Sequence, residues 1–214
     1  MATSEDTRAR ILEAAGSIFA EKGFASATVR EICQRAHANL AAVNYHFGDK
    51  QRLYVETVRQ AHQARARLGP IPQWPAETEP EQKLADFVRT LLRRMLLDDG
   101  SSWHAQLMLR EVSQPDADCR DLVVDYIRPQ FELLLSIIGE LVPAEVGIEQ
   151  RRLIAFSVVG QCLHYRVAGP VVRLLVPPDE HGSYTPERLA EHITAVTLAA
   201  LGRRAPVCGE GAVP

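Results

Sequence analysis

The chain has 214 residues and a mass of 23.7 kDa, and 46% of its residues are hydrophobic while 24% are charged. This composition predicts a folded protein and excludes a disordered, collagen-like or linker-dominated chain. The net charge of -3 excludes a protein that is basic over its whole surface, although it leaves room for a local basic face. The longest uncharged apolar run, 153–163, is shorter than the roughly 20 residues of a membrane span, and the N-terminus lacks the pattern of a signal peptide. We therefore expect a cytoplasmic protein that makes no contact with a membrane.

Helical periodicity dominates the N-terminal part of the chain. Apolar residues from Ile11 to Phe19 share one face of a first helix, and Gly23 is a typical helix stop. Thr28-Val-Arg-Glu31 has the pattern of a capping box, and Asn39 is a favourable N-cap for a helix of only two turns. The expected helices are 7–22, 28–35, 39–46 and a fourth that starts near residue 50, after Gly48-Asp49.

Residues 69–80 contain four prolines in twelve positions and cannot be helical throughout. Helical periodicity resumes beyond them, and strand-like alternation is absent. Pro129 lies inside one expected helix, where its missing amide should produce a kink. We expect an all-α fold of about nine helices, with a disordered tail from Arg203. The later helices are expected at 84–97, 103–112, 122–142, 149–166 and 186–202.

The four cysteines are scattered, without a C-x-x-C pair and without a histidine at the spacing of a metal site. We expect reduced thiols, no metal and no bound cofactor. The cysteines are Cys33, Cys119, Cys162 and Cys208.

Residues 28–46 fit a helix-turn-helix, in which a supporting helix and a short turn precede a second helix that is too short and too polar for a core. Small uncharged side chains on the second helix would let it enter a major groove about 12 Å wide, while polar and cationic groups around it would meet phosphates. The alternative is a three-helix cap whose Tyr45 and His46 merely pack or face water. The candidate DNA-binding residues are Thr28, Arg30, Asn39, Leu40, Ala41, Ala42, Asn44, Tyr45, His46 and Lys50.

Residues 8–54 closely resemble the DNA-binding domain of the TetR repressor family, matching it in order and spacing across four helices. The segments that carry the resemblance are Arg10-Ile-Leu-Glu-Ala-Ala15, Phe19-Ala-Glu-Lys-Gly-Phe24, Ala27-Thr-Val-Arg-Glu-Ile32 and Ala41-Ala-Val-Asn-Tyr-His-Phe-Gly-Asp-Lys50. The resemblance implies two kinds of contact with DNA. Phosphate contacts fall to Thr28, Tyr45, His46 and Lys50, and contacts with base edges to Leu40, Ala41, Ala42 and Asn44, of which Asn44 could pair with an adenine.

The turn departs from the family pattern. His37 stands where the family usually has Gly, and Ala38 and Asn39 stand where it usually has Val and Ser or Thr. Because His is among the residues that tolerate a positive φ, the turn can survive, and Asn39 keeps the helix cap.

Residues 153–163 are apolar on every face, and the last helix has a broad apolar surface, so both helices need burial on several sides. A second copy of the chain meets this need, and the resemblance likewise implies a dimer through the last two long helices. The alternative is a core that lies wholly within one chain. The candidate interface residues are Leu153, Val158, Leu163, Leu189, Ile193, Val196 and Ala200.

The resemblance further implies that helices 84–97, 103–112 and 122–142 enclose a pocket for a small, largely apolar effector. Polar or polarisable side chains on otherwise apolar helices are the candidate contacts, and for each of them a satisfied core position is the alternative. These residues are Trp103, His104, Met108, Arg110, Glu111, Tyr126, Gln130, His164 and Tyr165. The run Gln161-Cys-Leu-His-Tyr-Arg166 and the corner Arg110-Glu-Val-Ser-Gln-Pro115 also resemble the CecR-type branch of the family.

These features predict a ligand-responsive transcriptional regulator, a repressor that binds a short palindromic operator in double-stranded DNA as a homodimer and that an effector releases. The expected division is a DNA-binding domain 1–50, a ligand-binding and dimerisation domain 51–202, and a tail 203–214. A helical protein-interaction module is one rival. A small helical enzyme is another, because His104 and Glu111 could face one side of a helix, but no nucleophile elbow, Gly-rich phosphate loop or metal spacing supports it.

Overall fold

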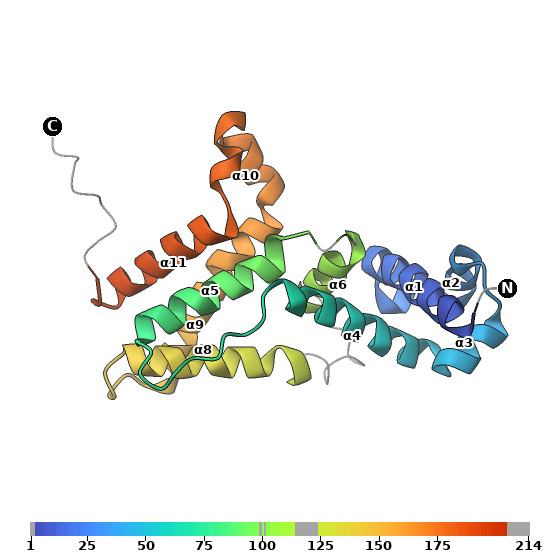
Figure 1. Cartoon of the computed structure of the whole chain (residues 1–214), viewed down its shortest axis with the longest axis horizontal. Helices are drawn as coiled ribbons and strands as arrows, with labels where there is room; N and C mark the ends of the chain where they lie inside the picture. The colour runs from blue at the N-terminus through green and yellow to red at the C-terminus, as the bar shows by residue number, and fades with distance from the viewer. Residues whose placement is uncertain (1–2, 99, 101, 114–123, 205–214) are drawn as a thin grey trace. The chain divides into compact units, whose positions relative to one another are not determined.

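The structure, a computed structural model, describes residues 3–98, 100, 102–113 and 124–204 (Figure 1). These residues form helices joined by turns and loops, without a strand among them, which confirms the all-α prediction. They divide into a first unit, Met1–Ala66 with Asp98–Pro129, and a second unit, Arg67–Leu97 with Gln130–Pro214. None of the described helices is long and apolar enough to cross a membrane.

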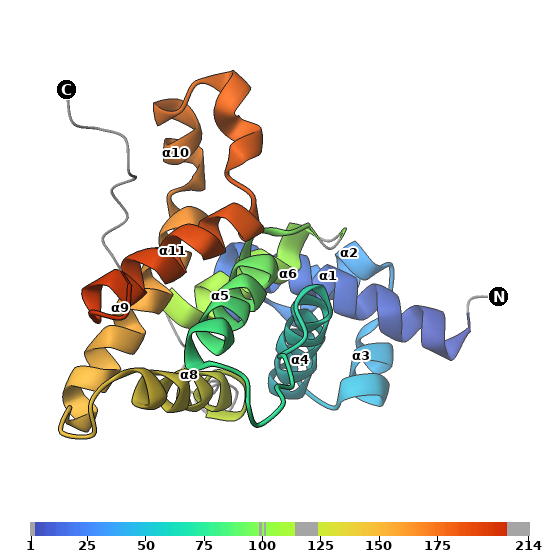
Figure 2. The same cartoon turned by 60° about the vertical axis from the view of Figure 1, so that its left-hand side comes forward.

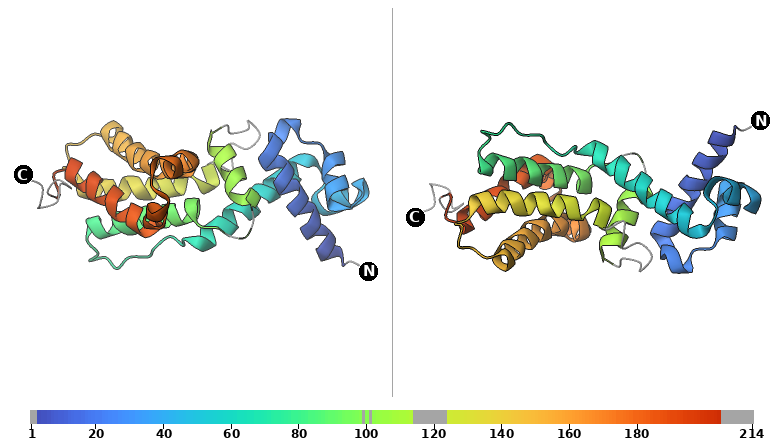
Figure 3. Two further views of the ribbon diagram at one scale, coloured as in Figure 1. Left: turned by 90° about the horizontal axis from the view of Figure 1, so that it is seen from above. Right: turned by 90° about the horizontal axis from the view of Figure 1, so that it is seen from below.

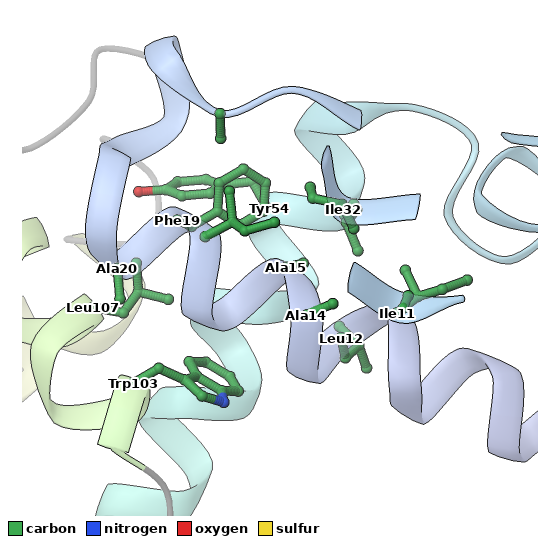
Figure 4. Close-up of a cluster of buried hydrophobic side chains, with 14 of the residues drawn as sticks. Ile11, Leu12, Ala14, Ala15, Phe19, Ala20, Ile32, Tyr54, Trp103 and Leu107 are labelled. Carbon is green, nitrogen blue, oxygen red and sulfur yellow. The ribbon is translucent and has the colours of Figure 1, made fainter. Parts of the chain in front are cut away.

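The first unit contains α1 (Ser4–Ser26), α2 (Val29–Ala36), α3 (Leu40–Phe47), nearly all of α4 (Lys50–Leu68) and α6 (Ser102–Ser113). Apolar side chains at helical spacing from all five helices meet in one core (Figure 4). The ring of Phe19 meets that of Tyr54 edge to face, with centroids 4.7 Å apart. Fully buried members of this core include Ile11, Ala15, Phe19, Ile32, Val43, Leu53, Tyr54 and Leu107.

The second unit contains α5 (Pro80–Leu96), most of α8 (Arg128–Leu141), α9 (Ile148–Val167), α10 (Gly169–Leu175), the 3₁₀ helix η2 (Pro178–Ser183) and α11 (Pro186–Ala200). Figure 3 shows α5 beside α11 and α9, and these helices pack against each other. Their core is mainly aliphatic, with Phe87 as a buried aromatic member. Its most deeply buried members include Leu84, Val88, Leu92, Leu134, Ile138, Ala155, Val158, Cys162 and Ile193.

The N-terminal helices follow their predicted boundaries closely. Regular helix ends at Gly23, whose φ of 77° breaks α1, and a short turn continues to Ser26. Thr28 and Asn39 each cap a helix as expected, and Asp49 accepts a hydrogen bond from the amide of Arg52 at the start of α4.

Three expectations for the C-terminal part need correction. The predicted helix 122–142 is not one kinked helix, because Ile127 is a turn and α8 begins at Arg128. Pro129 therefore lies in the first turn of α8, where the missing backbone amide of a proline costs little stability. Helices α10 and η2 were not expected at all. Arg203 is held in place, since its guanidinium donates to the Leu141 carbonyl at 2.8 Å, while the tail from residue 205 lies outside the described residues.

The proline-rich segment 69–79 is non-helical, as predicted, and is fixed to α5. Three residues on one stripe of α5 hold it: Asp86 accepts from the Trp74 indole at 3.2 Å, Thr90 donates to the Pro70 carbonyl at 3.4 Å, and Arg94 donates to the Gly69 carbonyl at 2.6 Å. This segment therefore lies along α5 as part of the second unit. The predicted division after residue 50 is a division by function and stays a prediction, because the units above reflect packing.

Candidate nucleic-acid interface

The supporting helix α2 is fixed at its start by a complete capping box. The Thr28 hydroxyl accepts from the Glu31 amide at 3.2 Å, and the Glu31 carboxylate accepts from the Thr28 amide at 3.1 Å. Lys22 forms an ion pair with the same carboxylate at 2.5 Å. The bond from Lys22, followed by those from Thr28, lowers the pKa of Glu31 to about 2. Thr28 is exposed, but its hydroxyl already serves as the cap.

The turn between α2 and α3 is made by His37 in the left-handed conformation, with φ 48° and ψ 46°. The amide of His37 donates to the Gln34 carbonyl at 3.3 Å, and that of Ala38 donates to the Cys33 carbonyl at 3.0 Å. This is a regular helix C-terminus in which His occupies the position that glycine usually fills. The expectation that His37 can adopt a positive φ is confirmed.

Helix α3 divides into a buried and an exposed face. Val43 and Phe47, four residues apart, are buried in the core of the first unit. The opposite face carries Leu40, which is 58% exposed, and Tyr45, which is 81% exposed. Ala41 and Asn44 are also exposed, whereas Ala42 and His46 are half-buried. The helix therefore presents a narrow surface of small and neutral side chains, ended by an aromatic hydroxyl.

Asn39 begins this helix by accepting a hydrogen bond from the Ala42 amide at 2.8 Å. The cap fixes the first turn, so that Leu40 and Ala41 lie at its exposed start. At the other end, the rings of Tyr45 and His46 meet edge to face with centroids 5.0 Å apart. Tyr45 therefore rests against His46 while most of its side chain stays exposed.

Cationic side chains flank α3. Lys50 lies at the start of α4 with its ammonium group 4.4 Å from the centre of the Phe24 ring, and Arg30 is exposed on α2. Within the described residues neither of them forms an ion pair with a carboxylate. Arg52, whose side chain is 77% exposed, is a further cation that was not among the predicted DNA-binding residues. Its position three residues after Asp49, in the first turn of the fourth helix, is the sequence signal that could have identified it.

The predicted effector contacts on α6 face the core of the first unit. Trp103 is 2% exposed and lies against Gly16, and Arg110 donates to the Lys22 carbonyl at 3.3 Å. Glu111 is buried and accepts a hydrogen bond from the Tyr54 hydroxyl. His104 is buried beside Trp103, with ring centroids 4.1 Å apart. The structure thus places these four residues in contact with α1, α4 or each other.

The remaining predicted effector contacts lie in different places. Tyr126 belongs to the first unit, where its ring is 4.2 Å from that of His62 and its hydroxyl accepts from Arg59. Met108 packs against the same core. Gln130 belongs to the second unit and accepts from Arg94 at 2.8 Å. The last two, His164 and Tyr165, are neighbours on α9; His164 is exposed and Tyr165 half-buried.

The predicted interface residues on α9 and α11 are divided between core and surface. Val158, Leu189 and Ile193 are buried inside the second unit, where side chains of their own chain cover them. Leu153 is 53% exposed. Ala200 is exposed, and Leu163 and Val196 are half-buried. Sequence alone could not make this division, because residues 153–163 are apolar on every side.

The cysteines that the structure describes are free thiols. Cys33 is half-buried and Cys162 buried, and burial raises the pKa of the Cys162 thiol to about 12. Cys119 and Cys208 lie outside the described residues. In the described part of the chain no group of His, Cys, Asp and Glu side chains could hold a metal ion.

Two protein-family models match the chain. "Bacterial regulatory proteins, tetR family" covers residues 11–57, and "HTH-type transcriptional dual regulator CecR, C-terminal domain" covers residues 80–201. The second match includes more than half of the chain. Together they account for the helix-turn-helix and for most of the helices that follow it.

Individual relatives agree with these models. The chain is 34% identical over 87 residues to the HTH-type transcriptional repressor AcnR of Corynebacterium efficiens, a match that spans 41% of each protein. It is 24% identical over 181 residues to the HTH-type transcriptional dual regulator CecR of Shigella flexneri, across 79% of this chain and 80% of that protein. The crystal structure of AibR in complex with isovaleryl coenzyme A and operator DNA has the same fold, with a TM-score of 0.63 and 17% identity over 89% of this chain and 97% of that one. The relatives are regulators of transcription, which are not enzymes, and the prediction of a non-enzymatic protein is confirmed.

Proposed function

The chain belongs to the TetR family of bacterial transcriptional regulators and has a CecR-type C-terminal domain, and from this premise we propose that it is a repressor that binds a short palindromic operator as a homodimer. A small effector bound by the helices beyond α4 releases the operator. The three parts of this proposal, which are groove binding, dimerisation and effector response, rest on different observations.

The exposed face of α3 is the observation that carries DNA binding. Ala41 and Asn44 are small enough to let the helix backbone approach base pairs, and Asn44 has the donor and acceptor pair that matches an adenine edge. Lys50, Arg30 and Arg52 flank this face with positive charge for phosphates. A buried structural helix would have no need for a face of this kind, with Tyr45 81% exposed at its end.

Dimerisation is supported by α9. Ala155, Val158 and Cys162 form its buried face. A second stripe, spaced at three and four residues on the other side, is exposed and carries no carboxylate, lysine or arginine. A two-fold partner helix would cover it, and a two-fold dimer matches a palindromic operator. We call this the α9 stripe; it consists of Leu153, Phe156, Gly160, His164 and Val167.

The effector response is supported by the packing of α6. Helix α6 contacts α1 through Trp103 and Arg110, and it contacts α4 through Glu111. An effector that prefers one arrangement of α6 would therefore change the elements that hold α2 and α3. A preference of about 1.4 kcal/mol would weaken operator binding tenfold. The related AibR was crystallised with isovaleryl coenzyme A and operator DNA, so this acyl-coenzyme A is a reasonable first probe.

Fluorescence anisotropy with fragments from upstream of the chain's own gene tests the proposal. Wild type should select one fragment that contains an inverted repeat. The double variant Asn44→Ala and Tyr45→Ala should bind this fragment at least tenfold more weakly, because one lost base contact costs about 1–3 kcal/mol and the dimer loses it in both half-sites. Tyr184→Ala is the matched control, since Tyr184 is an exposed tyrosine of the second unit, and it should bind like wild type.

Two results would contradict the proposal. If the double variant binds within threefold of wild type at the same salt concentration, α3 does not enter the major groove. Wild type that selects no fragment would favour the rival function of a helical protein-interaction module.

A further inference from the structure

Helix α10 is apolar and yet has no buried residue. Its sequence is Gly-Pro-Val-Val-Arg-Leu-Leu. Val171 is 53% exposed, Leu174 86% and Leu175 78%. Within the second unit, α10 projects away from α5, α9 and α11 (Figures 1 and 2). Exposed leucines occur singly on most proteins, but two adjacent ones with a valine on the same short helix form a patch that requires explanation.

The projecting segment is nevertheless an ordered structure. Nε2 of His181 lies 2.9 Å from both the Arg173 carbonyl and the Val176 carbonyl, so its N–H is shared between the two oxygens at the end of α10. Helix η2 supplies this histidine and folds the chain back toward α11. A helix of seven residues is too short to be stable by itself, and none of the residues of α10 is fully buried. We call residues 169–183 the arm.

We propose that the arm packs against a second copy of this chain and extends the dimer interface beyond α9 and α11. This inference rests on the proposed function, because it names the surface through which the proposed homodimer forms. Its apolar side chains, Val171, Leu174 and Leu175, are covered by the partner, and the arm of the partner is covered in return.

The continuity of the arm with the α9 stripe, and the number of residues that a stable interface needs, favour a second copy of this chain as the partner that covers the arm. Val167 is the last residue of the α9 stripe, and a single residue, Ala168, separates it from the arm, so the two apolar surfaces follow directly along the chain. A stable interface takes about 20–30 residues from each partner. The α9 stripe has five residues, and the arm adds three large apolar side chains, Val171, Leu174 and Leu175, which are 53%, 86% and 78% exposed. The stripe alone is therefore smaller than a stable interface, and the arm enlarges it with exposed apolar surface that follows directly after Val167.

The charges of the arm disfavour the other occupants. Arg173 is its single basic residue apart from His181, and Asp179 and Glu180 are exposed beside it. Membrane surfaces and DNA are both negatively charged and attract clusters of Lys and Arg, which the arm lacks. An apolar surface with few charges is instead typical of a protein interface.

Sedimentation equilibrium over a range of concentrations tests the arm. The double variant Leu174→Ser and Leu175→Ser should raise the dimer dissociation constant at least tenfold. Ile148→Ser is the matched control, because Ile148 is 54% exposed on α9 but lies off the stripe, and it should leave the constant within twofold of wild type. Since Leu174 and Leu175 make few contacts within the chain, far-UV circular dichroism of the variant should match that of wild type. A second variant, Val171→Ser, should weaken the dimer in the same direction.

The outcomes separate failure of the arm from failure of the proposed function. If both arm variants dimerise as wild type does while Phe156→Ser is monomeric, the inference about the arm is wrong and the proposed homodimer stands. Wild type that is monomeric at every concentration would overturn the arm and the homodimer together. Arm variants that become monomeric while the Ile148 control stays dimeric would support the inference.

Discussion

The indole of Trp103 lies against Gly16 so closely that a Cβ at residue 16 would be 2.3 Å from Cδ2 of the ring. Gly16 is buried in α1, and Trp103 comes from α6, 87 positions later in the chain. Figure 4 shows the indole beside α1, at the lower end of the cluster that contains Phe19 and Tyr54. The two helices approach each other this closely because residue 16 has no side chain.

We expect Gly16→Ala to lower the free energy of unfolding by about 1–3 kcal/mol, the usual cost of overpacking a core. The gain in helix propensity, about 1 kcal/mol, is too small to offset a clash with a ring on a packed helix. Chemical denaturation of wild type and variant measures the difference. In a Trp103→Leu background the same change should cost much less, and an equal cost in both backgrounds would contradict a clash with the indole.

Tyr54→Phe removes the hydroxyl that donates to the buried Glu111 carboxylate. A buried acceptor that loses a donor costs about 1–3 kcal/mol, so the melting temperature should fall. The phenyl ring keeps the edge-to-face contact with Phe19, so the change removes the hydroxyl and leaves this packing in place. Tyr184→Phe is the control at an exposed tyrosine and should leave the melting temperature unchanged. An unchanged melting temperature for Tyr54→Phe would mean that this hydrogen bond contributes nothing to stability.

His37→Gly tests the left-handed turn. A side chain at a φ of 48° costs roughly 1–2 kcal/mol, while glycine loses more conformational entropy on folding. The net result should be a gain of about 0.5–1 kcal/mol in the free energy of unfolding, and His37→Val should instead lose at least about 1 kcal/mol. Urea denaturation separates the two variants. If the valine variant is as stable as wild type, residue 37 is not in this conformation.

Glu31→Gln should flatten the dependence of stability on pH in acid. The folded-state pKa of Glu31 is lowered to about 2 from an ordinary value of 4.5, so below pH 4.5 the unfolded chain binds more protons at this site than the folded protein does. The stabilisation is fully present above about pH 4.5 and is lost as the pH falls toward 2. Melting temperatures between pH 2 and 6 should fall less steeply for the variant. Glu13→Gln, at an exposed position on α1, is the control and should follow the wild-type slope.

Lys50→Ala should weaken binding to specific and nonspecific DNA by the same factor, because an ammonium group beside α3 meets phosphate and reads no base. The slope of log K against log salt should decrease in magnitude by about one unit. Anisotropy titrations at several salt concentrations measure both quantities. A loss confined to the operator sequence would indicate that Lys50 contacts a base edge instead.

Local signals explain why the helix-turn-helix could be predicted residue by residue. Thr28 and Asn39 act on amides within three residues of themselves, and Val43 and Phe47 show the buried face of α3 by their spacing. Such information is contained in short windows of sequence. The surroundings of α6 are different, because Tyr54 and Glu111 are 57 positions apart and no periodicity connects them.

Two further features were beyond sequence reasoning for related reasons. Residues 153–163 of α9 are apolar on every face, so whether Val158 or Leu153 is buried depends on where α5 and α11 pack. The break at Ile127 precedes Pro129 by two residues. A proline indicates that the helix is interrupted near this point, but it does not determine whether the helix kinks or a new helix begins.

The order of the two units along the chain limits which hybrids with related proteins can fold after recombination between their genes. A hybrid joined within the proline-rich segment 69–79 combines α1–α4 of one parent with α6 of the other, although α6 completes the core that α1 and α4 form. The resulting hybrid would place an unrelated side chain against Gly16 in the position of Trp103. Functional hybrids should therefore inherit residues 98–113 together with 1–66, and a fragment cut off after α4 should expose the surface that Trp103 and Leu107 cover.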